Sequence, residues 1–445
     1  MFLIDLNEYF SNVNNVKMLL LNVYYNKNIR IENIFMRTNS KIFYNIKIKN
    51  IKIIEFWNNP RNIGHLQKLK ILDCTNNNID QINITKLFSL TKLYWSINRK
   101  IANINHLRNL VTLKCGWIKG TVQSDIKNLT KITKLNCDHN NFINNVNHLQ
   151  NLKKLSCYGD SGLNQNSINK ISKLVELYCD GNKKIISVSH LQKLRILHCK
   201  NNTGIDQNGI CGVLNNKISK LSCSDNDKIY DVNHMKNLKI LRCNRSSGIN
   251  QDGISKITNL RKLSCTNNQK IININHMKSL LVLHCNGYSK IDQNGIYCLT
   301  NITKLICHSN KNINDVNHIQ KLKILNCCNS GIDQTGITSL INLVELRCGN
   351  NKIKDINHMN KLTMLSCYQN SSLDQNGISK MTNIIVLDCD DNEKIKDINH
   401  MKNLKKLYCR GDSGLSPNGI SQLKNILKIH VKNNINFVHH DFNKN

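Results

Sequence analysis

The chain has 445 residues, 40% of them hydrophobic, and its 62 lysines and arginines against 29 acidic residues leave a formal net charge of +33. No uninterrupted apolar run is long enough to cross a bilayer, so we expect no membrane-spanning helix. Asp5 and Glu8 lie where a secretory signal would carry positive charge, so we expect no export. Nineteen cysteines without a signal favour a reducing compartment, and we expect a cytoplasmic protein.

The strong basic charge has two interpretations. A charge balance of this kind is typical of proteins that bind nucleic acid or acidic surfaces. It also arises when a chain rich in lysine, asparagine and isoleucine carries an ordinary solvated surface. With only two prolines, this composition is what an AT-rich genome produces. The charge alone therefore does not decide between a binding surface and a solvated one.

Residues 1–50 lack a regular pattern. One degenerate copy of the repeat described below fits this stretch, at Met18, Leu21, Val23 and Asn26. We therefore predict that the segment caps the N-terminal end of a repeat array, because terminal repeats must cover a core that would otherwise be exposed.

Residues 51–434 consist of about nineteen copies of a unit about twenty residues long, with the frame L-x-x-L-x-C-x-x-N. Most of the cysteines occupy one slot of this frame: Cys74, Cys115, Cys137, Cys157, Cys179, Cys199, Cys223, Cys243, Cys265, Cys285, Cys307, Cys327, Cys348, Cys367, Cys389 and Cys409. Phe56, Trp95 and Val431 fill the slot elsewhere. Because each copy contacts only its neighbours, we predict one elongated array. Residues 435–445 are predicted to form a polar tail.

Two kinds of repeat alternate within the array. Histidine repeats carry a histidine nine residues before the slot, as His276 does before Cys285. Glycine-turn repeats carry a sequence similar to Ser-Gly-Ile-Asp-Gln-Asn-Gly-Ile, as at 330–337 before Cys348. Together they form a double unit of about 42 residues. The histidines that mark it are His65, His106, His148, His190, His234, His276, His318, His358 and His400.

The frame resembles the leucine-rich repeat family, whose L-x-x-L-x-L-x-x-N core it matches with cysteine at the third apolar position. The histidine repeats look like the short internalin-type variety. The family's asparagine position is held by Asn77, Asn140, Asn182, Asn202, Asn226, Asn268, Asn310, Asn351, Asn370 and Asn392. Other residues replace it at Ile118, Asp160, Ser246, Tyr288, Ser330 and Asp412.

The resemblance implies an α/β repeat solenoid, a curved horseshoe with a parallel β-sheet on the concave face and short helices or turns on the convex face. Strand residues alternate sides, so the second leucine and the cysteine of each frame should point into the core. The asparagine should then satisfy backbone donors in the tight turn that follows. In glycine-turn repeats, Asp292 or Asp333 is placed to cap a short convex helix.

The regular spacing argues against chemistry at the cysteines and histidines. Adjacent strands lie ~4.8 Å apart, whereas a disulfide needs Cβ atoms ~3.8 Å apart, and a straight row of thiols cannot converge on one zinc ion. Successive histidines lie ~10 Å apart, so one ion cannot join two of them. We predict a structural role for them at the convex turn, with the preceding asparagine as a helix cap.

Nothing in the chain predicts catalysis. The Asp-Gln-Asn-Gly turns supply too few oxygens for calcium. No nucleophile, base and orienting acid are assembled, and no phosphate-binding glycine loop is present. We therefore predict no metal, no cofactor and no enzymatic activity.

The outward positions of the concave face, three before, one before and one after the slot, supply the candidate partner-binding residues. In glycine-turn repeats the first of these is Lys92, Lys134, Lys220, Lys262, Lys304 and Lys428, interrupted by Glu176, Glu345 and Val386. In histidine repeats it is Ile71, Ile196, Ile240, Val282, Ile324 and Met364, with Thr112, Lys154 and Lys406 as exceptions.

Five tyrosines stand beside these rows: Tyr94, Tyr158, Tyr178, Tyr368 and Tyr408. Cys328, one past the slot, is expected to be a solvent-facing thiol on the same surface. Tyrosines and exposed apolar patches are typical of partner sites. Isoleucine and lysine also suit an ordinary solvated strand, which is the alternative reading of the rows.

From these features we expect a non-enzymatic scaffold whose concave face binds an acidic, partly apolar protein. Nucleic-acid binding through the basic surface is the alternative, although aromatic residues make up only 5% of the chain. A third possibility is a ubiquitin-ligase substrate adaptor, with an F-box-like motif in residues 1–50. We predict no membrane partner, and the oligomeric state stays open.

Overall fold

A computed structural model describes residues 53–55, 63–75, 79–96, 100–101, 103–117, 123–212 and 217–437. The predicted N-terminal cap, Phe56, Asn77, Ile118 and the end of the predicted tail lie outside these residues. The chain divides into two compact units, Met1–Leu155 with Ser161–Leu163 (unit 1) and Ser156–Asp160 with Asn164–Asn445 (unit 2). Each unit is described by itself.

Both units are solenoids of three-residue strands, each placed directly before a slot residue, as the frame predicts. Unit 1 contains β1 (Ile53–Glu55), β2 (Ile71–Asp73), β3 (Lys92–Tyr94), β4 (Thr112–Lys114) and β5 (Lys134–Asn136). These five strands pair in parallel and in chain order. Strand β6 (Lys154–Ser156) lies at the boundary between the units.

Unit 2 continues the same pattern over thirteen strands. They are β7 (Glu176–Tyr178), β8 (Ile196–His198), β9 (Lys220–Ser222), β10 (Ile240–Arg242), β11 (Lys262–Ser264), β12 (Val282–His284), β13 (Lys304–Ile306), β14 (Ile324–Asn326), β15 (Glu345–Arg347), β16 (Met364–Ser366), β17 (Val386–Asp388), β18 (Lys406–Tyr408) and β19 (Lys428–His430). All pair in parallel with their chain neighbours, without a change of register.

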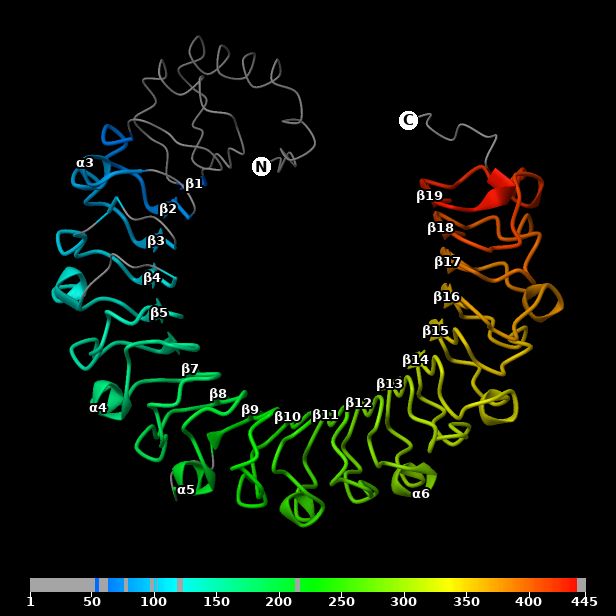
Figure 1. The fold of residues 1–445 in the computed structure, drawn as a ribbon, viewed down its shortest axis with the longest axis horizontal. Helices are drawn as coiled ribbons and strands as arrows, with labels where there is room; N and C mark the ends of the chain where they lie inside the picture. Colours follow the sequence, from blue (N-terminus) through cyan, green and yellow to red (C-terminus); the bar gives the residue numbers. More distant parts are fainter. Residues whose placement is uncertain are drawn as a thin grey trace, which may run out of the picture. The chain divides into compact units, whose positions relative to one another are not determined.

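Short helices lie in the glycine-turn repeats, and one more, η8, follows the last strand. The α-helices are α3 (Gln81–Ile84), α4 (Gln165–Ile168), α5 (Gln207–Ile210) and α6 (Gln293–Ile296). The 3₁₀ helices are η2 (Gln123–Ile126), η4 (Asp252–Ile254), η5 (Thr335–Ile337), η6 (Asn376–Ile378), η7 (Asn418–Ile420) and η8 (Ile435–Phe437). Within unit 2 the strands line the inner, concave side and α4, α5 and α6 lie on the outer, convex side (Figure 1). The predicted fold class is confirmed.

The core is a thin column of aliphatic side chains and thiols. In β11 the middle residue Leu263 and the slot residue Cys265 are fully buried, and the same holds for the other slot cysteines. Trp95, which fills the slot in its repeat, is also fully buried. Cysteine suits the slot because it is a small apolar side chain that fits between closely stacked turns.

A buried asparagine ties each glycine-turn repeat's outgoing loop to the repeat before it. Asn268 donates from Nδ2 to the carbonyl oxygens of Cys243 (2.9 Å) and Ile249 (3.1 Å), and its Oδ1 accepts from the Lys270 N–H (2.8 Å). Equivalent asparagines are buried throughout the described array: Asn140, Asn182, Asn226, Asn310, Asn351 and Asn392. The predicted turn role is confirmed for these residues, and the bonds to the preceding repeat extend it.

Two asparagines assigned to this position, Asn202 and Asn370, do not occupy it. Both side chains are exposed, and the next residues, Thr203 and Ser371, are buried instead. The loop after a histidine-repeat slot places a hydroxyl there, as Ser371 shows by accepting from the Leu373 N–H (3.3 Å). The assignment was wrong because this loop is one residue longer than the frame assumes.

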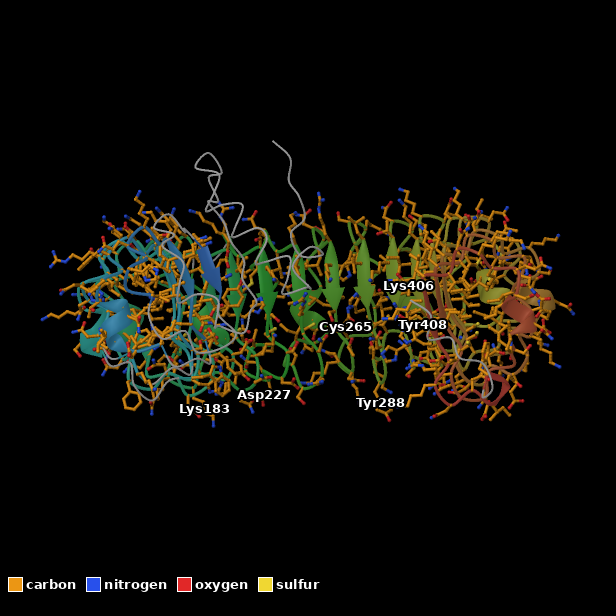
Figure 2. The ribbon with its side chains drawn as sticks, turned by 90° about the horizontal axis from the view of Figure 1, so that it is seen from above. Lys183, Asp227, Cys265, Tyr288, Lys406 and Tyr408 are labelled. Atoms are coloured by element: carbon orange, nitrogen blue, oxygen red, sulfur yellow. The ribbon has the colours of Figure 1, made fainter. Side chains whose placement is uncertain are left out.

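The exposed tips of these loops lie along one edge of unit 2. Lys183, Asp227 and Tyr288 mark that edge, on the side where the strands end (Figure 2). Tyr288, which stands at the frame's asparagine position, is 78% exposed, while the following Ser289 is buried. Tyr288 therefore takes no part in the core.

Glutamine and asparagine side chains join the repeats on the convex side. Gln251 donates from Nε2 to the Asn273 carbonyl oxygen (2.8 Å), and its Oε1 accepts from the N–H groups of Ile272 and Asn273 (3.0 and 2.9 Å). Asn275 reaches the next repeat in the same way, donating to the Asn294 carbonyl oxygen (2.6 Å) and accepting from the Cys298 N–H (2.8 Å). Each repeat is thus bonded to both of its neighbours.

The histidines have the structural role predicted for them. His276 Nε2 lies 3.0 Å from the carbonyl oxygen of Ile254 in the preceding repeat, and seven other repeats show the same contact. The prediction that the preceding asparagine caps a helix is wrong. The histidine is followed by a turn rather than a helix, so Asn275 is left to bond the next repeat.

Helix capping occurs instead at the aspartates of the glycine-turn repeats. Asp292 accepts from the Gly295 N–H (2.8 Å) at the start of α6, as predicted. Asp333 accepts from the Thr335 N–H (2.9 Å), but the N-cap residue of η5 is Gln334 and no side chain caps that helix, so the prediction is wrong for Asp333. The glycine that follows is required by packing, because a Cβ on Gly295 would lie 2.1 Å from the Ile272 carbonyl oxygen.

We predict that Asn268→Ala lowers the free energy of unfolding by ~2–4 kcal/mol, because two carbonyls and one N–H lose their buried partner. Urea unfolding followed by circular dichroism measures the change. Asn370→Ala removes the same side chain from the same frame position but at an exposed site, and should stay within ~0.5 kcal/mol of the parent. Equal losses in the two variants would contradict the assignment.

Candidate partner-binding surface

The predicted lysine and aliphatic rows form one continuous line on the concave face of unit 2. Their register partners run in the order Ile196, Lys220, Ile240, Lys262, Val282, Lys304 and Ile324, one residue on each strand from β8 to β14. These residues are half-buried at the strand surface. Lysine and aliphatic side chains therefore alternate at every strand, about 4.8 Å apart.

A second outward row adds one cation and one histidine that the sequence analysis did not single out. Arg242 and His284 lie one residue before the slot on β10 and β12, on the strands whose first residue is aliphatic. The cations therefore zigzag between the two rows. We define the basic strip as Lys220, Arg242, Lys262 and Lys304. The alternation of the two repeat types was the sequence signal for this strip. The strip itself can be recognised only when the strand register of both rows is known.

Three of the four charges of the basic strip are not neutralised by an ion pair within the described chain. Among the described residues, Arg242, Lys262 and Lys304 form no ion pair, and β8 to β14 carry no acidic residue at their three outward positions. Outside the strip two concave cations of unit 2 have acidic partners, Arg347 with Glu345 at 2.8 Å and Arg410 with Asp390 at 2.7 Å. Unit 2 therefore lacks concave carboxylates from β8 to β14 and carries them from β15 to β17.

The uncompensated charges shift nearby pKa values. Burial, followed by Arg242, Lys304 and Lys220, lowers the pKa of Lys262. Burial and then the charges of Lys262, Lys304 and Arg242 lower the pKa of His284 to about 4. His284 is therefore neutral at pH 7, and like-charge repulsion within the strip favours binding of an anionic group.

Several polar atoms on this part of the face have no hydrogen-bond partner within the described chain. They are Ser222 Oγ, His284 Nε2 and Asn286 Oδ1. Ser222 is fully buried, and it lies on β9 beside Arg242 in the register. Unsatisfied polar atoms of this kind are uncommon in folded proteins.

The other predicted site residues lie elsewhere. Lys92, Tyr94 and Lys134 belong to unit 1, on β3 and β5. Tyr158 follows β6, and its side chain is 38% exposed.

Tyr178 on β7 donates to Glu176 (2.9 Å), and its ring lies 4.6 Å from that of His198. Tyr408 on β18 stacks on His430 at 4.5 Å and carries Arg410 over its ring. Lys406 and Tyr408 share that strand (Figure 2). The tyrosines therefore do not line the basic strip.

The expectation of a solvent-facing thiol at Cys328 is wrong. Cys328 is only 6% exposed. The ring of Tyr368 covers it, since a Cβ on neighbouring Gly349 would lie 2.8 Å from a Tyr368 ring carbon and the Tyr368 hydroxyl interacts with the Cys328 thiol. Because Gly349 has no side chain, the large ring from the next repeat can lie across both positions.

The slot cysteines form an inert row. Burial raises the pKa of Cys223 to about 12 and that of Cys265 to about 12, so almost no thiolate exists at neutral pH. Cys211 and Cys298 are exposed, unlike the other seventeen. Within the described residues no group of three or more metal-ligating side chains converges, and no helix is long and apolar enough to cross a membrane.

Comparison with known proteins places this geometry in a structural class. No protein-family model matches the chain, and no curated protein matches its sequence. Among solved structures it is similar to the TLR13–ssRNA13 complex, with a TM-score of 0.56 and 16% identity over 87% of this chain and 75% of that one.

Two Listeria monocytogenes proteins are also similar. The functional domain of InlJ, which includes a cysteine ladder, has a TM-score of 0.49 and 21% identity over 78% of this chain and 76% of its own. The internalin InlF has a TM-score of 0.47 and 21% identity over 69% and 88%.

The repeat frame, the parallel strand of each turn and the likeness in fold define a leucine-rich repeat solenoid. The chain therefore has the leucine-rich repeat fold.

We predict that N-ethylmaleimide modifies Cys211 and Cys298 rapidly in the native protein, while the slot thiols and Cys328 react only in denaturant. The physical reason is exposure, because buried thiols with raised pKa values are poor nucleophiles. Peptide mass spectrometry identifies the labelled sites. Tyr368→Ala should add Cys328 to the fast group, and fast native labelling of the slot row would contradict the buried arrangement.

We predict that the imidazole of His284 titrates near pH 4 by NMR. Because the folded pKa lies below the ordinary value of ~6.5, the unfolded chain binds the proton more readily, so stability from this group is full above pH ~6.5 and falls between pH ~6.5 and ~4. Lys262→Gln with Lys304→Gln should raise the pKa partway, because burial, the larger cause, is unchanged. Lys354→Gln with Lys396→Gln on exposed sites should leave it unmoved.

Proposed function

We propose that this protein is a non-enzymatic scaffold that binds an acidic, partly apolar protein on the concave face of unit 2. The observation that carries the proposal is the basic strip in register with Ile240, Val282 and Ile324. A surface that alternates uncompensated cations with aliphatic side chains matches a partner that alternates carboxylates with apolar groups.

The partner's charge is argued from the contrast within unit 2. Two concave cations outside the strip, Arg347 and Arg410, have acidic partners in the chain itself. Among the described residues, Arg242, Lys262 and Lys304 have none. An acidic partner would supply the missing charges and relieve the repulsion that, after burial, lowers the pKa of Lys262.

Nucleic acid is the second candidate partner. The net charge of +33 favours it, and one protein similar in fold was solved in complex with ssRNA. Against it, no tyrosine, tryptophan or phenylalanine stands at the outward positions of β8 to β14, whereas single-strand binders stack bases on such rings.

A cytoplasmic location is part of the proposal. The row of buried free thiols supports it, because a reducing compartment preserves free thiols during folding. Fractionation of cells that produce the protein tests this point.

The test of the function is affinity capture from a cytosolic lysate, with and without nuclease. We expect a stoichiometric protein partner that survives nuclease and is lost from a variant carrying Lys220→Glu, Lys262→Glu and Lys304→Glu. A matched variant with Lys256→Glu, Lys354→Glu and Lys396→Glu makes the same charge change at exposed sites away from the strands. It should retain the partner.

Circular dichroism and urea unfolding confirm that both triple variants are folded. Retention of the partner by the concave variant would overturn the proposed face. Loss of all bound material on nuclease treatment would overturn the protein partner in favour of nucleic acid, with affinity then falling steeply as salt rises.

A further inference from the structure

The spacing of the basic strip defines the shape of the segment that it binds, an inference that rests on the proposed function. We infer that the segment is an acidic amphipathic α-helix lying across strands β9 to β13. It presents carboxylates at i, i+7 and i+14 to Lys220, Lys262 and Lys304, and apolar side chains between them to Ile240 and Val282.

The distance between lysines on alternate strands matches the distance between same-face residues of an α-helix. Neighbouring strands are ~4.8 Å apart, so lysines on alternate strands recur every ~9.6 Å. Seven residues of an α-helix rise ~10.5 Å and return to nearly the same face. From Lys220 to Lys304 the two spacings accumulate to ~19 Å and ~21 Å, a difference that flexible lysine side chains absorb.

Extended conformations fit less well. A β-strand presents same-face residues every ~6.8 Å, which is out of step with the ~9.6 Å lysine period. A polyproline II segment returns to one face every ~9.3 Å, which matches the lysines. Midway between two such positions, the polyproline II segment presents no side chain on that face. Ile240 and Val282 lie at that level. The aliphatic side chains would then stay uncovered.

The second outward row fits the same helix. At the axial level midway between two acidic residues, a helix presents two side chains, i+3 and i+4, about 100° apart. The strand below presents two outward residues at that level, Ile240 with Arg242 on β10 and Val282 with His284 on β12. One helical position therefore faces the aliphatic row and the other faces Arg242 or His284.

The pKa of His284 should change when a partner occupies the basic strip. Its imidazole is neutral because burial and three neighbouring cations disfavour the proton, and its Nε2 has no partner in the described chain. A carboxylate bound to Lys262 or Lys304 offsets their charges, two of the causes that lower this pKa. Binding should therefore raise the pKa of His284 above about 4.

The test uses the full chain and synthetic peptides, with affinity measured by fluorescence anisotropy. The probe is an alanine-rich helix of about 18 residues with glutamate at i, i+7 and i+14 and leucine at the intervening i+4 and i+11. One isomer of identical composition has its glutamates at i, i+5 and i+10, which spreads them around the helix. A second has the probe's spacing with proline at two central positions. A uridine oligonucleotide of similar length represents nucleic acid.

We expect the in-phase peptide to bind at least tenfold tighter than either comparison peptide. Lys262→Glu with Lys304→Glu should weaken that binding at least tenfold, while Lys354→Glu with Lys396→Glu leaves it unchanged. The His284 NMR signal, assigned by its loss in His284→Asn, should titrate at higher pH in the saturated complex.

Equal affinity for the in-phase and proline peptides, with the same loss in the Lys262→Glu, Lys304→Glu variant, would overturn the helical partner and leave the concave protein site standing. Binding of the oligonucleotide but not of the peptides would overturn both. Unchanged affinity of the peptide for the Lys262→Glu, Lys304→Glu variant would overturn the strip as its binding site. The capture experiment tests the proposed function separately.

Discussion

The buried asparagine at the end of alternate strands is the constraint on which the array depends. At this point the chain leaves the sheet, and the carbonyls of the preceding turn face inward with no strand partner. Asn268 satisfies two of those carbonyls and one N–H of its own loop. Because the bonds run between repeats, they set the distance between turns as well as the shape of one turn, and a buried amide that lost them would carry a large penalty.

Regular repeats allow much of the fold to be read from the sequence, because the period of the buried side chains is the period of the structure. The slots at Cys265 and Cys285 locate β11 and β12 without further information. The asparagine at 370 was misassigned because a one-residue insertion shifts a loop without changing the apolar frame. A side chain's place in a turn depends on local backbone conformation, which the apolar pattern does not encode.

The candidate surface was predictable only in part. The row of lysines that includes Lys262 can be predicted by counting three residues back from each slot. The zigzag with Arg242 requires the register of two rows, and the absence of concave acid from β8 to β14 requires knowing which side chains share a face. Cys328 was misplaced for a related reason: Tyr368, two repeats further along the chain, reaches across Gly349 and covers it. The sequence of one repeat does not show such contacts between repeats.

The two repeat types link the stability of the array to the pattern on its surface. Loops alternate between asparagine and hydroxyl chemistry with the 42-residue double unit. From β8 to β14 the first residue of each strand alternates between aliphatic and lysine with the same double unit. Gain or loss of one whole double unit would therefore keep both patterns in phase and change only the length of the face. Gain or loss of a single repeat would place two like loops next to each other and interrupt the ~9.6 Å charge period. The hydrogen bonds that hold the turns together thus also preserve the spacing of the charges that a long partner would contact.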